Sequence, residues 1–256
     1  MIPDPINILP MFTLVLIRTA SVLFFSPIYN QASLPVIVKI GLALVISFAI
    51  FPTISSSQLA LPDDMISFIL IVFKELAIGF LIGYVATLAF AAFVMGGGLI
   101  SNEMGLTMAE LVDPLSGDRV SPISQLLQTV ALILFFAING HHWLINALIL
   151  SYKTVPVTGV IDLGFSMSKI MDLFNGLFIA AIKIAAPIMI VLGLTVVVSG
   201  FLARSTPEIN IFLIIFPMKI LVGFLLLFIM FPFITRAIEY LLDLLRKDIF
   251  SLVGGM

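Results

Sequence analysis

The chain contains no cysteine, and this absence excludes several kinds of chemistry. Disulfides, thiolate metal sites and cysteine nucleophiles all need a side chain that none of the 256 residues supplies. Histidine occurs only as the neighbouring pair His141 and His142, which does not match the metal-binding pair of histidines four residues apart on one helix face. We therefore expect no metal and no cofactor.

Charged residues are also scarce. They make up 10% of the chain, against roughly a quarter in soluble domains, and 61% of the residues are hydrophobic. The mean hydropathy is +1.27. A net charge of −2 gives no sign of nucleic-acid binding. This composition predicts an integral membrane protein, whose solvent is membrane lipid or a large apolar partner surface.

The few carboxylates form no catalytic pattern. Glu103, Glu110 and Asp113 lie close together in the sequence, but no nucleophile and base accompany them. The run Gly96–Gly98 is not followed by Lys-Ser or Lys-Thr, so it is not a phosphate-binding loop. We expect this run to let the backbone turn sharply after a long helix. The chain is predicted not to be an enzyme.

Apolar blocks predict an all-α polytopic membrane protein of long, partly broken helical hairpins. Six blocks stand out, at residues 9–29, 36–52, 65–95, 124–150, 172–203 and 209–233. One crossing needs about 20 apolar residues, so the blocks at 65–95 and 172–203 predict strong tilt, a kink or a break. We read residues 9–29 as a retained span. Residues 139–145 (NGHHWLI) predict a break or a polar patch where a helix meets an interface.

No long polar linker divides the chain, so we expect one membrane domain over residues 1–256, with a loop region at 96–123. Residues 204–208 predict the turn of a hairpin. Residues 234–256 carry apolar and charged side chains at helical spacing, which predicts an amphipathic C-terminal helix. It would lie on the membrane surface, dock on a partner, or form the solvated end of the last helix.

Several charges lie inside or at the edges of the apolar blocks. Besides Arg18 and Lys39, they are Lys74, Glu75, Lys183 and Lys219. A central charge that faces lipid costs at least about 2.5–3.5 kcal/mol, so we expect these residues to face protein or water, or to reach the membrane surface. Lys74 and Glu75 are consecutive and need different partners. Gly79 and Gly83 form a GxxxG pair that favours close helix packing.

Four stretches resemble the FliR/SctT family of flagellar and type III secretion export-gate subunits. The most specific is ISNEMGLTMAELVDPLSG at 100–117, which resembles the family's Gly-Leu…Val-Asp-Pro loop. The others are PVIVKIGLALVISFAIFP at 35–52, FAINGHHWLI at 136–145 and ARSTPEINIFLIIFPMKILVGF at 203–224. The four occur in the family's order and cover nearly the whole chain.

The resemblance implies a non-enzymatic subunit at the entrance of an export channel in the bacterial inner membrane, at the base of the flagellar basal body. It implies a helical hetero-oligomeric assembly with about five FliP-like and several FliQ-like subunits. FlhB-like and FlhA-like proteins are the implied further partners, and unfolded flagellar proteins the implied substrates. Alternatives are an injectisome export-gate subunit and a secondary transporter or channel, which would also explain the intramembrane charges.

The resemblance also implies a loop that plugs the closed pore, here at about Gly105–Gly117. Met108 and Leu111 stand where family members often carry bulky aromatic residues, and methionine can still seal an irregular gap. We expect Met108 and Leu111 to close the lumen, while Asp113 and Pro114 fix the turn of the loop. The alternative is that Met108 and Leu111 are ordinary packing residues.

Overall fold

The structure of the chain is a computed structural model, and it describes residues 5–27, 29, 35–54, 64–107, 121–157, 159, 161–205 and 211–256. The described residues form helices and connections, with no strand among them. The helices are α1 (Pro5–Phe25), α2 (Val36–Ile50), the 3₁₀ helix η1 (Phe51–Thr53), α3 (Met65–Met104), α5 (Pro122–Ala137), α6 (Gly140–Thr154), α7 (Leu163–Ser205) and α8 (Ile211–Gly255).

Within this described part, five helices are long and apolar enough to cross a membrane, or six if the bent pair α5 and α6 counts as one span. The predicted all-α fold with about six apolar segments is therefore confirmed. The predicted break at residues 139–145 is confirmed as well, because α5 ends at Ala137 and a new helix, α6, begins at Gly140. Asn139 has φ of 57° at this break, a left-handed conformation that asparagine tolerates better than most residues.

The glycine run does not turn the chain, so that expectation was wrong. Gly96, Gly97 and Gly98 lie inside α3, which continues to Met104. A Cβ added to Gly97 would lie 2.5 Å from the Cα atom of Ser124, and one on Gly96 would lie 3.2 Å from the carbonyl oxygen of Ala181. The missing side chains let α5 and α7 approach the backbone of α3, and helical hydrogen bonding outweighs the flexibility of the glycines.

The last two helices are longer than their apolar blocks. α7 has 43 residues and contains Pro187, and α8 has 45 residues and contains Pro217 and Pro232. The predicted turn at 204–208 lies largely outside the described residues. The amphipathic segment 234–256 is the C-terminal part of α8 and is not a separate helix.

The chain divides into two compact units. Unit 1 comprises Met1–Ala89, Ile138–Phe174 and Asp243–Met256, and unit 2 comprises Phe90–Ala137 and Asn175–Leu242. The single membrane domain expected from the sequence stays a prediction.

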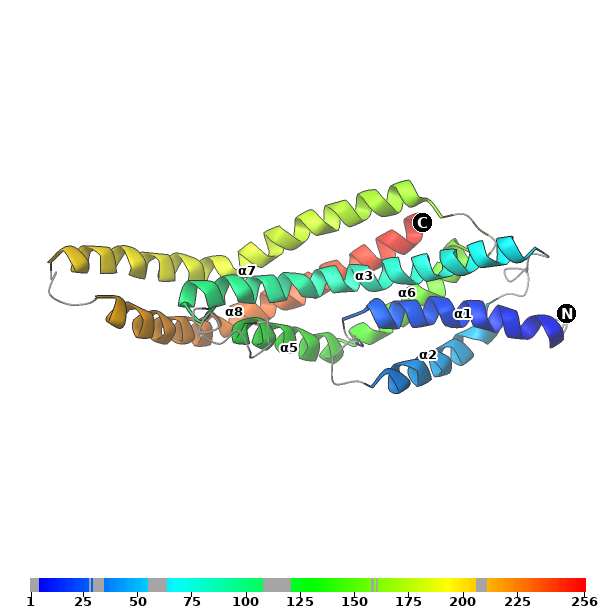
Figure 1. Ribbon diagram of the computed structural model, residues 1–256, viewed down its shortest axis with the longest axis horizontal. Helices are drawn as coiled ribbons and strands as arrows, with labels where there is room; N and C mark the ends of the chain where they lie inside the picture. The colour runs from blue at the N-terminus through cyan, green and yellow to red at the C-terminus, as the bar shows by residue number, and fades with distance from the viewer. Residues whose placement is uncertain are drawn as a thin grey trace. The chain divides into compact units, whose positions relative to one another are not determined.

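In unit 1, α1 and α2 lie side by side (Figure 1), and the Phe12 and Phe51 rings meet edge to face at 5.7 Å. The apolar side of the C-terminal segment contributes buried Leu245, Ile249 and Leu252 to this unit.

In unit 2, the core is built around aromatic side chains of α3 and α5. The ring of Phe90 lies edge to face with those of Phe93 and Phe135, at 5.7 and 5.9 Å. The Ser124 hydroxyl donates to the carbonyl oxygen of Val94 at 2.7 Å, which ties α5 to α3.

Candidate functional site

Two charged residues of unit 1 are completely buried and bind each other. Arg18 of α1 and Glu75 of α3 both have 0% exposed side chains. The guanidinium donates from Nε to Oε2 at 2.5 Å and from Nη2 to Oε1 at 2.8 Å, which is a bidentate pair. Burial of a charge is tolerated when a partner and hydrogen bonds replace water. This pair therefore joins α1 to α3 at one point.

The C-terminal end of α6 completes the surroundings of Arg18. Nη1 donates to the Ser151 hydroxyl at 3.0 Å, and Nη2 also donates to the carbonyl oxygen of Val155 at 3.1 Å. The guanidinium carbon lies 4.0 Å from the centre of the Tyr152 ring, within cation–π range. Tyr152 in turn donates to the carbonyl oxygen of Val15 at 3.3 Å. One arginine thus connects three helices.

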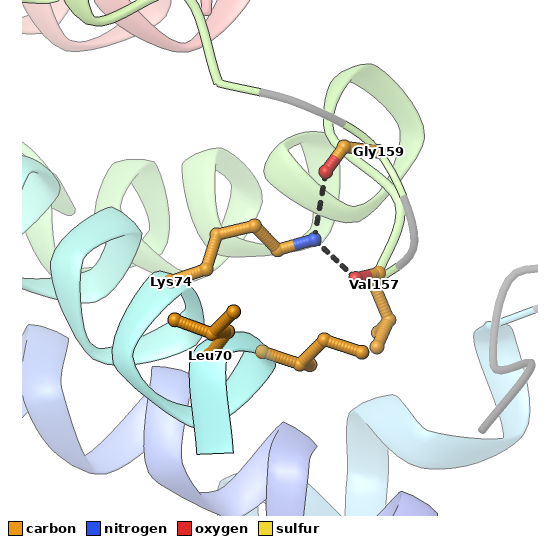
Figure 2. Close-up of a pocket in the computed structure, with 5 residues that line it drawn as sticks. Leu70, Lys74, Val157 and Gly159 are labelled. Carbon is orange, nitrogen blue, oxygen red and sulfur yellow. Dashed lines mark hydrogen bonds between the residues drawn. The ribbon is translucent and has the colours of Figure 1, made fainter. Parts of the chain in front are cut away.

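Lys74 points elsewhere and binds backbone oxygens. Its ammonium donates to the carbonyl oxygens of Pro156, Val157 and Gly159, the first at 3.2 Å and the last at 2.9 Å. Figure 2 shows the Lys74 side chain reaching across to this connection after α6. All three donors of an ammonium are used in this way. Lys74 lines an adjacent cavity of about 250 Å³. Its ammonium therefore has no hydrogen-bond donor left for a molecule in that cavity.

Gly79 and Gly83 lie where α3 crosses α1. A Cβ on Gly79 would lie 2.5 Å from the carbonyl oxygen of Arg18, and one on Gly83 would lie 2.8 Å from that of Val22. Both contacts are with backbone, which cannot move aside as a flexible side chain can. The glycine pair brings the two helices close enough for the buried ion pair to form.

In unit 2, Gly105 ends α3. Its φ is +81°, its N–H donates to the carbonyl oxygen of Asn102, and the N–H of Leu106 donates to that of Ser101. These two bonds with a left-handed glycine are a Schellman motif, which satisfies carbonyls at a helix end. Gly105 is thus the cap from which residues 106–117 continue.

One further embedded charge has a partner near this cap. Lys219 of α8 lies 3.9 Å from Glu103 of α3, with exposed fractions of 14% and 33% for the two side chains. The pair is long and partly open to solvent, so it is weaker than the pair of Arg18 and Glu75. It nevertheless places α8 beside the start of the expected loop.

Comparison with known proteins decides the family. The model of the family described as "Bacterial export proteins, family 1" matches residues 9–245. The chain belongs to this family. The Flagellar biosynthetic protein FliR of Bacillus subtilis is 28% identical over 256 residues, covering 97% of this chain and 98% of the relative. FliR of Escherichia coli is 30% identical over 241 residues, covering 94% and 90%.

A second group of relatives carries a different name. The Surface presentation of antigens protein SpaR of Shigella flexneri is 26% identical over 216 residues, covering 84% of this chain and 82% of the relative. The resemblance to the FliR/SctT family is thus confirmed, and this bacterial export protein has relatives named for flagellar biosynthesis and for the surface presentation of antigens.

The four remaining residues of the expected plug, Met108, Leu111, Asp113 and Pro114, lie outside the described residues. Lys183 lies exposed on α7, and no described residue forms an ion pair or hydrogen bond with it. The roles expected for these residues in the export protein stay predictions.

The described residues hold no group of three or more His, Cys, Asp or Glu side chains that could bind a metal ion. The rings of His141 and His142 lie closer together than consecutive helical positions suggest, with their centres 4.2 Å apart.

The sequence of this export protein shows Arg18 and Glu75 as charges in apolar blocks, but it does not reveal that they pair, because they lie 57 positions apart. A usable signal was present, because Glu75 is the one acidic residue well inside an apolar block. An embedded carboxylate needs an embedded cation, and Arg18 is a candidate in another block.

Proposed function

We propose that this export protein is a non-enzymatic core subunit of a flagellar type III export gate, through which unfolded flagellar proteins leave the cell. The observation that carries the proposal is how much of each chain is aligned. The alignments with two proteins named FliR cover at least 94% of this chain and at least 90% of each relative. The match is therefore to the whole subunit and not to a shared membrane segment. The proposed location of this subunit is the bacterial inner membrane.

A hetero-oligomeric assembly with FliP-like and FliQ-like subunits is part of this proposal, with FlhB-like and FlhA-like proteins as further partners. Exposed Lys183 supports it, since an isolated lysine facing hydrocarbon costs at least about 2.5–3.5 kcal/mol. A polar group of another subunit would remove that cost. Lys183→Leu should then reduce recovery of the complex, and native mass spectrometry of the co-purified subunits measures this directly.

The loop about Gly105–Gly117 is proposed to plug the closed pore, with Met108 and Leu111 as the sealing side chains. The chain leaves α3 through the Gly105 cap, which gives this segment a fixed starting point. Asp113 and Pro114 are proposed to hold the turn, because proline fixes φ and aspartate accepts local backbone hydrogen bonds.

Photo-crosslinking tests the plug. A crosslinking amino acid at position 108 or 111 should capture an export substrate that is stalled in the channel by a folded C-terminal fusion. The same probe at Val45, an exposed position of α2, is the matched control and should capture none. Equal capture at Val45 and at position 108, or none at position 108 or 111 while export proceeds, would contradict the proposal.

An injectisome gate is the second candidate, and the SpaR relatives favour it. Complementation separates the two: a flagellar subunit should restore motility to a strain lacking its own FliR, while an injectisome subunit should restore effector secretion instead.

A further inference from the structure

α7 carries apolar side chains on two opposite sides, and one of them is packed inside unit 2. This side lies against α3, where a Cβ added to Gly96 would lie 3.2 Å from the carbonyl oxygen of Ala181. Its side chains are 0–3% exposed and recur every three or four positions, as the core side of a helix does. They belong to Ala181, Ile184, Ala185, Ile188 and Leu192.

The opposite side of α7 is exposed over about five turns of the helix. Its residues also recur every three or four positions, about half a turn away from the buried side. They are Ile179, Lys183, Pro187, Ile190, Leu194 and Val197, and we call these six residues the Lys183 face. Its four aliphatic side chains have exposed fractions of 56–64%.

Two polar groups of one residue lie in the middle of this face. The ammonium of Lys183 has three hydrogen-bond donors, and no described residue accepts from it. Pro187, four positions further on, has no N–H, so the carbonyl oxygen of Lys183 receives no hydrogen bond from that position. The Lys183 face therefore presents a cation and a backbone acceptor among apolar side chains.

Lipid alone does not suit both the lysine and its apolar neighbours. Exposed apolar side chains continue along α7 to Met171 in one direction and to Val198 in the other, about 18 and 22 Å from Lys183. If hydrocarbon surrounds both stretches, the ammonium lies within it, at a high cost. If the ammonium lies at the membrane surface, the apolar side chains beyond it stand in water. A protein with a polar group opposite Lys183 removes both costs.

We propose that the Lys183 face binds a membrane helix of another subunit, and that this helix carries a carboxylate opposite Lys183 in an otherwise apolar stripe. The inference rests on the proposed assembly. Charge complementarity selects this occupant, because Glu75 is the one acidic residue well inside an apolar block of this chain, and Arg18 binds it. The spacing of three and four places the partner helix nearly along α7.

Recovery of the co-purified complex, measured by native mass spectrometry, tests the charge. Lys183→Met should lower recovery several-fold, because the carboxylate of the partner is left buried without a cation. Lys183→Glu should lower it further through repulsion, whereas Lys183→Arg should keep most of it. If only lipid covered this face, Lys183→Met would recover as much complex as the parent or more. Lys247→Met removes an exposed ammonium elsewhere and is the control.

The melting temperature of the full chain alone in mild detergent separates assembly from folding. Lys183→Met should melt with the parent, because no described residue bonds to the ammonium that it removes. If this variant melts lower, the crosslinking of the native chain described next decides instead.

Dicyclohexylcarbodiimide, which enters membranes, identifies the partner in the native complex by joining a carboxylate to an amine in contact with it. Peptide mass spectrometry should find Lys183 joined through an amide to an Asp or Glu of another subunit. Lys183→Glu together with replacement of the joined carboxylate by lysine should then restore the recovery that each single reversal loses.

The outcomes distinguish this inference from the proposed assembly. If the parent chain recovers no other subunit, both are overturned. If the parent assembles while Lys183→Met recovers as much complex, the docking of a carboxylate-bearing helix is overturned and the assembly stands. The same conclusion follows if the carbodiimide joins Lys183 only to a residue of this chain, or to none.

Discussion

Removing one member of the buried Arg18–Glu75 pair should destabilise unit 1 more than any exposed charge substitution. Arg18→Met leaves a carboxylate with 0% exposure and no cation beside it, and Glu75→Leu leaves a buried guanidinium without its anion. Water cannot reach either group to compensate. The remaining partners of Arg18, the Ser151 hydroxyl and the Val155 carbonyl, are neutral and cannot replace the carboxylate.

The expected cost is large for a single substitution. Breaking a buried pair from one side costs about 3–5 kcal/mol, because the desolvated charge is left uncompensated. For a chain of this size, 1 kcal/mol shifts the melting temperature by about 2–4 °C, so each single variant should melt about 6–20 °C lower. The double variant should recover much of this, since apolar residues of similar volume replace a buried pair at little cost.

The unfolding of the full chain in mild detergent measures these shifts. Trp143 is the only tryptophan and lies on α6, which supplies Ser151 and Tyr152 to the cluster, so its fluorescence reports on unit 1. Lys247→Met is the control, because Lys247 and Asp243 form an exposed pair at 2.8 Å that should contribute little. If the double variant loses as much free energy of unfolding as the two single variants added together, the two charges do not depend on each other and the reasoning is refuted.

Three further predictions use the same unfolding measurement. Gly79→Leu should destabilise by at least about 1–3 kcal/mol, because its Cβ meets the α1 backbone, whereas Gly41→Leu, with open space around the Cβ, should not; equal shifts would contradict the close crossing. Lys74→Met should lower the free energy of unfolding by about 1–3 kcal/mol, because the carbonyl oxygens that Lys74 binds lose their donor. An unchanged melting temperature would show that water replaces the ammonium. Asn139→Val should lower the free energy of unfolding by about 1–2 kcal/mol, because valine tolerates the positive φ of this position poorly. Asn139→Gly should leave stability unchanged or raise it. If the glycine variant were the less stable of the two, backbone conformation would be excluded as the cause.

Hydropathy located the helices well but their ends poorly. The block at 65–95 became α3, which runs to Met104, because Gly96 and Gly97 allow close packing on neighbouring helices and do not end the helix. α3 ends at a local signal, the Gly105 cap, although the resemblance implies that Gly105 belongs to the plug. A glycine can permit close approach or a left-handed turn, and only the packing decides which.

The candidate site was predictable in its parts and not in its pairings. Glu75 and Arg18 were both recognisable as charges in apolar blocks, yet which charges meet depends on how the helices pack. Lys74 was even less predictable, since its partners are backbone oxygens of a connection more than 80 positions away, and every residue has such oxygens.

The length of α3 shows why hydropathy does not translate into membrane crossings. Its 40 residues include no proline, and at 1.5 Å per residue they span about 60 Å, twice the roughly 30 Å of hydrocarbon. A straight helix of that length would need a tilt of about 60° to stay inside, well beyond the roughly 0–40° that membrane helices adopt. Part of α3 must therefore leave the hydrocarbon, although its first turns expose Ile66, Leu70 and Phe73. If these first turns are the part outside lipid, protein must cover their apolar side chains, and the proposed assembly with other subunits would supply that cover.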